Sequence, residues 1–146
     1  MPQRYLFDTN VLVAALRSDR GASRKLLLRA LDGDIVVLAS VPLMLEYEAV
    51  LTRNEHLAAC GLSSEETNAV LDGFASVAEP IRLRFLWRPQ LKDPADEMVL
   101  EAAVNGGADR LVTFNLRHLK QAALKFGIAT VSPPEAWKEI VSDEKK

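Results

Sequence analysis

The spacing of apolar residues divides the chain into short strands that alternate with helices. Apolar segments at Arg4–Phe7 and Ile35–Leu38 predict buried strands, because short apolar runs bounded by turn residues are typical of a parallel sheet. Alternating positions over Pro80–Phe85 predict a third strand. Two further short apolar runs predict strands at Leu111–Thr113 and Ile128–Val131.

Helices are expected between these strands, and several carry recognisable end signals. Ser40 and Ser63 are typical N-cap residues, and Glu66 completes a capping box with Ser63. Alternation of strands and helices predicts an α/β sandwich built on a parallel sheet. The expected helices are Asn10–Arg17, Arg24–Leu31, Ser40 to about Arg53, Glu55–Cys60, Ser63–Ser76, Asp93 to Gly106, Lys120–Lys125 and Pro134–Val141.

Composition is that of one globular domain. The chain has 146 residues, of which 49% are hydrophobic and 26% are charged, and this balance allows a sizeable core and excludes intrinsic disorder. We expect one domain over residues 1–141 and a solvated tail over 142–146. No apolar run approaches the ~18 residues of a membrane span, and no signal peptide pattern opens the chain. The single cysteine, Cys60, excludes an internal disulfide, and the expected location is cytoplasmic.

Charge is distributed in blocks of alternating sign. The net charge is −2, yet residues 1–31 carry +4 and residues 32–79 carry −8. Residues 80–92 and 110–126 are again basic, on either side of an acidic segment at 93–109. Solvated helix faces explain such blocks. An acidic centre flanked by basic strips is also what a metal-dependent enzyme needs to act on a polyanion.

Oxygen-bearing side chains follow four of the predicted strands. Asp8 follows the first strand, Glu46 lies on the helix after the second, Asp96 follows the third, and Thr113 and Asn115 end the fourth. Ligands of open parallel sheets bind outside the carboxyl ends of the strands. The four segments are therefore expected to meet at one edge of the sheet.

Two of these carboxylates lie on apolar helix faces. Asp96 is in line with apolar residues three, four, seven and eight positions further along its helix, and Glu46 lies beside a similar stripe. A carboxylate there costs several kcal/mol unless it is paired or binds a cation, and neither segment supplies a basic partner. Taken singly, Asp8 is explained as a helix cap, Asn115 as a turn residue and His118 as an ordinary surface or packed histidine. Taken together, the carboxylates favour a shared site.

The chemistry of that site is expected to involve a hard cation. Oxygen ligands without histidine or cysteine favour Mg²⁺ or Mn²⁺ over zinc. Such ions activate water and stabilise the leaving oxygen in phosphodiester cleavage. The sequence has no nucleophile elbow, dinucleotide-binding glycine motif or P-loop.

Four segments together resemble the PIN-domain family of ribonucleases, which includes the VapC-type toxins of bacterial toxin–antitoxin pairs. The segments are Tyr5–Leu12, Ser40–Tyr47, Asp93–Met98 and Gly107–Asn115, and the resemblance extends to Val131. It implies a three-layer α/β/α sandwich with a central, mostly parallel sheet. It also implies a Mg²⁺ or Mn²⁺ site.

The resemblance assigns roles to individual residues. Asp8, Glu46 and Asp96 match the first three acidic positions of the family and would hold the ion. Asn115 stands at the fourth acidic position; it would position water, and its neutral amide implies one well-held ion with any second recruited by substrate phosphate. Thr113 would orient a ligand or phosphate. Four arginines are candidates for binding an RNA backbone: Arg17, Arg20, Arg24 and Arg117. Their exposure to solvent alone explains these residues equally well.

The implied activity is hydrolysis of RNA phosphodiester bonds by the toxin of a type II toxin–antitoxin pair. The expected partners are an RNA substrate, a cognate antitoxin and a second copy in a homodimer, with no membrane. Asn115 also motivates an alternative, a PIN-like protein that binds RNA or acts as a scaffold without catalysis. A structure-specific DNA nuclease is a further alternative, ranked lower because 146 residues leave little room for additional DNA-binding elements.

Overall fold

A five-stranded parallel sheet forms the centre of the molecule. The computed structural model describes residues 3–84 and 91–145. Every strand pairing is parallel, and the strand order is β3-β2-β1-β4-β5. The strands are β1 (Arg4–Phe7), β2 (Val36–Ala39), β3 (Glu79–Pro80), β4 (Arg110–Val112) and β5 (Ala129–Val131).

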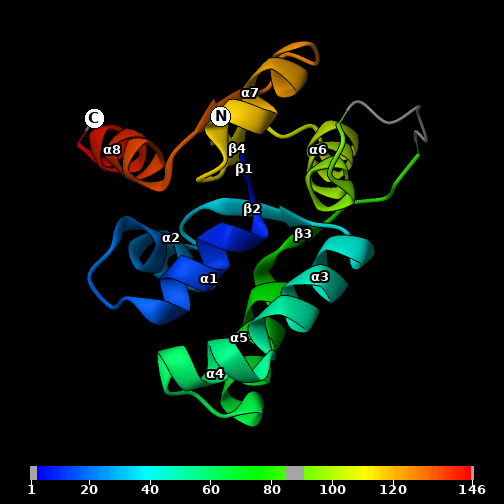
Figure 1. The fold of residues 1–146 in the computed structure, drawn as a ribbon. Coiled ribbons are helices and arrows are strands. Elements are labelled where there is room, and N and C mark those ends of the chain that lie inside the picture. Colours follow the sequence, from blue (N-terminus) through cyan, green and yellow to red (C-terminus); the bar gives the residue numbers. More distant parts are fainter. Residues whose placement is uncertain (1–2, 85–90, 146) are drawn as a thin grey trace.

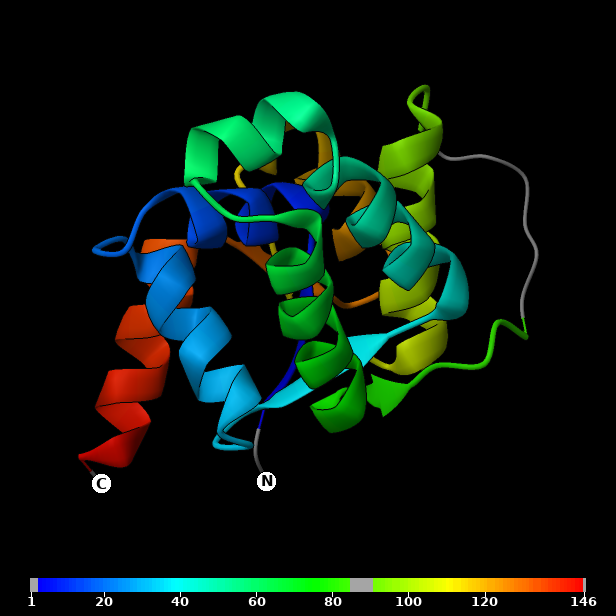
Figure 2. The same ribbon diagram turned by 90° about the horizontal axis from the view of Figure 1, so that it is seen from below.

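Helices cover both faces of this sheet and complete a three-layer sandwich. Helices α1 to α5 lie on one side, and α6 and α7 lie on the other (Figure 1). Seen from below, α8 lies beside α2, and α5 lies between α2 and α3 (Figure 2). The helices are α1 (Thr9–Arg17), α2 (Ala22–Leu31), α3 (Val41–Leu51), α4 (Asn54–Cys60), α5 (Ser64–Val77), α6 (Pro94–Gly106), α7 (Leu116–Leu124) and α8 (Pro133–Glu144). Among the described residues, no helix is long and apolar enough to cross a membrane.

The strand order reverses at β1. From β1 the chain adds β2 and β3 on one side, and it then returns to place β4 and β5 on the other. Crossovers between parallel strands are right-handed, so this reversal puts the helices of the two halves on opposite faces. The carboxyl ends of β1 and β4 therefore border the crevice where ligands of open α/β sheets bind.

An aromatic cluster fixes the end of β1. Phe7, Tyr47 and Phe74 are fully buried, with ring centroids 6.2 Å apart for Phe7 and Phe74 and 5.8 Å apart for Tyr47 and Phe74. The Tyr47 hydroxyl donates a hydrogen bond to the Phe7 carbonyl, and burial raises the Tyr47 pKa well above its ordinary value. Helix α3 is thereby tied to the last residue of β1.

Two predicted elements differ from the structure by four residues or more. The strand expected over Pro80–Phe85 is only Glu79–Pro80, because the chain then leaves β2 and the Arg84 N–H donates to the Asn105 side chain of α6. Phe85 lies outside the described residues. Helix α7 begins at Leu116, four residues before the predicted start at Lys120.

The last helix is also longer than predicted. Its predicted end was Val141, but α8 continues to Glu144, so the first part of the expected tail is helical. An ion pair between Arg29 of α2 and Glu144 holds this last turn against the neighbouring helix. Tertiary contact therefore extends the helix beyond its local pattern.

Candidate functional site

Asp8 is placed by the junction of β1 and α1. It occupies the N-cap position of α1, yet its side chain makes no capping hydrogen bond. The Asp8 N–H donates to the Val112 carbonyl at 2.9 Å, which continues the pairing of β1 with β4. The Asp8 carboxylate oxygen Oδ2 instead accepts a 2.6 Å hydrogen bond from the Thr113 hydroxyl. The Asp8 carboxylate is therefore held toward Thr113, the residue that directly follows β4.

A row of hydrogen bonds connects Asp8 to Asp96 through Thr113 and Asn115. The Asn115 backbone N–H donates to the Thr113 hydroxyl oxygen at 2.9 Å. The Asn115 side-chain amide donates to both carboxylate oxygens of Asp96, each at 3.3 Å. Asn115 is the N-cap of α7 and, like Asp8, makes no capping hydrogen bond with its side chain. These four residues are called the acidic row below.

The first turn of α6 places Asp96 in this row. Asp93 caps the helix by accepting a hydrogen bond from the Ala95 N–H, as its position before Pro94 predicts. Val99 and Leu100, one turn further along, are buried against the sheet. Asp96 is therefore carried on the buried face of α6, where the sequence pattern placed it.

Burial makes the charged forms of both carboxylates costly. It raises the pKa of Asp8, and the charges of Asp96 and Glu46 raise it further, against the hydrogen bonds from Thr113 and Thr9. Burial and the charge of Asp93 raise the pKa of Asp96, while Asn115 and His118 lower it. Within residues 3–84 and 91–145, no lysine or arginine forms an ion pair with Asp8 or Asp96.

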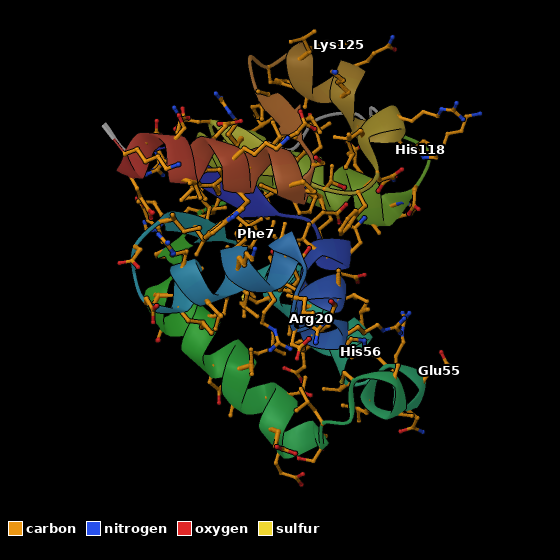
Figure 3. All side chains as sticks on the ribbon, turned by 90° about the vertical axis from the view of Figure 1, so that its left-hand side faces the viewer. Phe7, Arg20, Glu55, His56, His118 and Lys125 are labelled. Carbon is orange, nitrogen blue, oxygen red and sulfur yellow. The ribbon has the colours of Figure 1, made fainter. Side chains whose placement is uncertain are left out.

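His118 is a neighbour of the acidic row that the sequence did not assign to it. Its Nδ1 lies 4.0 Å from the Asp96 carboxylate, although the His118 side chain remains mostly exposed on the outside of α7 (Figure 3). The signal that could have found it is helical spacing. His118 lies three residues after Asn115, so the two side chains share a helix face.

Glu46 lies near the row without joining its hydrogen bonds. It is half-buried on α3, and its charge reaches Asp8. In the described parts of the chain, no three His, Cys, Asp or Glu side chains gather closely enough to hold a metal ion as they stand. The donors fit Mg²⁺ or Mn²⁺ in kind, because they are carboxylate oxygens, and the described residues offer the two buried ones, Asp8 and Asp96, no lysine or arginine partner.

The four arginines suggested by sequence differ in their contacts. Arg24 donates from Nε to the Ala15 carbonyl and so joins α2 to α1. Arg17 donates from Nε to Nδ1 of the buried His56, a contact of 3.2 Å that joins α1 to α4. Arg20 and Arg117 are exposed. Arg20 precedes α2, and Arg117 lies two residues after Asn115.

Comparisons with known proteins agree with this fold. A family model described as the PIN domain matches residues 4–117, a span that contains the whole acidic row and Glu46. The solved structure of VapBC2 from Rickettsia felis bound to a DNA fragment from their promoter matches with a TM-score of 0.59 and 18% identity, over 89% of this chain and 98% of that chain. That likeness concerns the fold alone. No curated protein matches the sequence. Because the family model covers most of the chain, the protein belongs to the PIN-domain family.

Proposed function

We propose that this protein is a ribonuclease that hydrolyses RNA phosphodiester bonds with Mg²⁺ or Mn²⁺ and acts as the toxin of a type II toxin–antitoxin pair. PIN domains are nucleases as a family. The observation that carries the proposal is the acidic row: two buried carboxylates, linked through Thr113 and Asn115, at the point where the strand order reverses.

Asp8, Asp96 and Glu46 are the residues that would hold the ion. When bound, the ion supplies activation of water and stabilisation of the leaving oxygen. Thr113 holds one Asp8 oxygen in place before any ligand arrives. Asn115 does the same for Asp96 through its amide nitrogen, which leaves the amide oxygen to accept a hydrogen bond from water.

Backbone contacts support Glu46 as the third ligand. Tyr47, the next residue, bonds to the carbonyl of Phe7, and Phe7 directly precedes Asp8. The backbones that carry Glu46 and Asp8 are thus tied together through a fully buried contact.

An RNA substrate accounts for the basic segments around the site. Arg20 and Arg117 are exposed and would contact phosphates. Such contacts contribute to the affinity for RNA without giving sequence specificity. The VapBC2 likeness supports an antitoxin as the protein partner, since that structure is a complex of the toxin–antitoxin pair.

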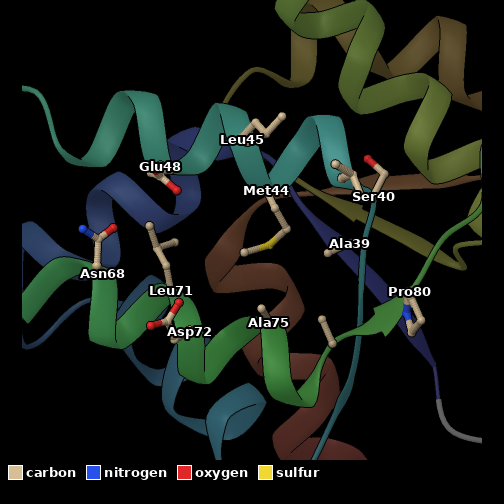
Figure 4. A pocket seen from close by; sticks show the side chains of 12 residues that line it. Ala39, Ser40, Met44, Leu45, Glu48, Asn68, Leu71, Asp72, Ala75 and Pro80 are labelled. Carbon is tan, nitrogen blue, oxygen red and sulfur yellow. The ribbon is translucent and has the colours of Figure 1, made fainter.

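A homodimer is also proposed, and an apolar groove between α3 and α5 supports it. The groove holds about 270 Å³ (Figure 4). On its α3 rim, Val41 is 72% exposed and Leu45 is 62% exposed, a degree of exposure that a second copy would reduce. Sedimentation should show a dimer for the parent protein and a monomer for Leu45→Glu. A parent protein that is monomeric at high concentration contradicts the proposal.

Catalysis is tested by cleavage of single-stranded RNA with Mn²⁺. We expect cleavage by the parent protein and a loss of at least about 100-fold in Asp8→Asn and Asp96→Asn, because each change removes a charged ligand. Asp34→Asn, a change of the same kind at an exposed position between α2 and β2, should cleave normally. If the Asp8 and Asp96 variants cleave like the parent, the assigned roles are wrong.

The same assay separates the second candidate function, an RNA-binding PIN-like protein without catalysis. The neutral Asn115, which the family resemblance puts at its fourth acidic position, favours it. It predicts RNA binding without cleavage under every metal condition. The toxin role is tested separately, by growth arrest on expression that co-expression of the adjacent open reading frame relieves.

A further inference from the structure

A cavity next to the acidic row combines features of a nucleobase site. It holds about 180 Å³ and lies between the end of α1, the start of α2, the start of α8 and Phe114. This volume is below the roughly 300 Å³ at which pockets begin to take drug-sized ligands. A cavity of this size suits one planar group of a longer polymer.

Phe114 connects this cavity to the proposed active site. It stands between Thr113 and Asn115 in the chain, and its N–H donates to the Asn10 side chain at 3.3 Å. Ala14, which lines the cavity, lies one helical turn after Asn10 on α1. The cavity therefore lies about 9 Å along α1 from Asp8, close enough for a neighbouring nucleotide of the same strand to reach.

The ring of Phe114 is exposed although an aromatic residue normally avoids water. Its exposed fraction is 52%, and Pro133 and Pro134 also line the cavity. Exposed aromatic rings on nucleic-acid-binding surfaces stack against bases whatever their sequence. A ring beside two prolines suits the flat face of a base.

A cation lies next to the cavity, where the phosphate of a nucleotide would be. Arg20 is exposed and directly precedes Gly21, which lines the cavity. Ser23 also lines the cavity, but its hydroxyl oxygen is fully buried, so a base in the cavity would not reach it.

We infer that this cavity binds one base of a single-stranded RNA, with the ring stacked on Phe114 and its phosphate near Arg20. The inference rests on the proposed function, because it takes the nucleotide to be part of the substrate at Asp8. It adds to that function a binding site that distinguishes single-stranded RNA with accessible bases from a sugar–phosphate backbone without bases.

Direct binding tests the inference without cleavage. Anisotropy of a short fluorescein-labelled RNA is measured in EDTA, beside a matched oligomer in which abasic positions replace the bases. Phe114→Leu should weaken binding of the normal RNA by about 5- to 140-fold, the range for loss of one stacked base, and leave abasic binding unchanged. Phe114→Tyr keeps the ring and should bind like the parent. Phe126→Leu, at an aromatic residue 41% exposed beyond the end of α7, is the control and should also bind like the parent.

Arg20→Gln gives an independent test of the phosphate contact. It should weaken binding of the normal and abasic oligomers equally, because Arg20 would contact the backbone and not the base. Normal RNA binding by Phe114→Leu overturns the base site and leaves the nuclease proposal intact. Equal loss on normal and abasic oligomers in Phe114→Leu also overturns it, because the ring would then act on the backbone or the fold. A parent protein that neither binds nor cleaves RNA overturns both proposals.

Discussion

The effect of Asp8→Asn on stability should change sign when a divalent cation is added. Without a cation, the charged Asp8 carboxylate is buried beside Asp96 and Glu46, and its raised pKa indicates that burial and these charges outweigh its hydrogen bonds. Asparagine removes the charge and keeps an oxygen that can accept from Thr113. The variant should therefore be more stable than the parent when no cation is present.

The size of the effect follows from chain length and from binding linkage. A 146-residue domain unfolds with an entropy of about 0.3 kcal/mol/K, so about 1 kcal/mol corresponds to about 3 °C. If Asp8→Asn relieves about 1 kcal/mol, a typical contribution of one buried polar contact, it melts about 3 °C above the parent. A cation at 100 times its Kd adds about 2.7 kcal/mol, or about 9 °C, to the parent alone. With the cation, the variant should melt about 6 °C below the parent.

The pH dependence has a definite direction. The folded-state pKa of Asp8 lies above its ordinary value of 3.8, so the folded protein binds the proton more tightly than the unfolded chain does. The Asp8 contribution to stability is thus full below pH 3.8 and is lost as the pH rises through the folded-state pKa. The advantage of Asp8→Asn should therefore be present at neutral pH and absent below pH 3.8.

Thermal melting followed by circular dichroism, with EDTA or Mn²⁺ and over a pH series, tests these predictions. It measures the stability difference between Asp8→Asn and the parent without the cation, the same difference with the cation, and its dependence on pH. Asp34→Asn is the control, and its response to Mn²⁺ should equal that of the parent. Two results would refute the reasoning. One is an equal Mn²⁺ response in the parent and Asp8→Asn; the other is an Asp8→Asn variant that is less stable than the parent in EDTA.

Two further substitutions test the surroundings of Asp8. Asn115→Asp replaces the amide that bonds Asp96 by a fourth carboxylate, so melting in EDTA should fall by about 3 °C or more while calorimetry shows tighter Mn²⁺ binding; unchanged Mn²⁺ affinity would place Asn115 outside the metal site. Tyr47→Phe leaves the buried Phe7 carbonyl without its side-chain donor, so the melting temperature should fall by about 3–9 °C, and cleavage measured well below that temperature should also fall if the contact positions Asp8 and Glu46. Normal cleavage with a lower melting temperature would give Tyr47 a purely structural role.

The elements best predicted from sequence are those with signals at both ends. Helix α6 follows Asp93-Pro94 and stops at a left-handed glycine, Gly107, and its observed bounds agree with the predicted ones. The strand predicted over Pro80–Phe85 had the right alternation but no residue that signals its end. The length of a strand depends instead on the neighbouring strand with which it pairs. As an edge strand, β3 has only β2 beside it, and the chain turns to α6 instead.

In the candidate site, too, the sequence predicts local features and misses contacts between residues that are far apart in the chain. The sequence predicts which strand ends carry Asp8, Asp96 and Asn115, because strand ends of a parallel sheet share an edge. It does not reveal that Asp8 and Asn115 leave their helix-capping positions unused and bond to Thr113 and Asp96 instead. That choice depends on pairing between β1 and β4, residues about a hundred positions apart.

The neutral side chain of Asn115 accounts for the hydrogen bonds at the Asp96 end of the row. A carboxylate at residue 115 would repel Asp96, so the two could share this position only when a cation or a proton lay between them. The Asn115 amide is neutral and donates to Asp96, which orders that carboxylate in advance at no cost in charge. Asp8 is ordered in the same way by Thr113. Glu46 is then the one expected ligand still to be brought in, and its backbone is already tied to β1 through Tyr47. An ion at this site would therefore find the Asp8 and Asp96 side chains already held in place. Its affinity would depend mainly on how readily the Glu46 side chain joins it.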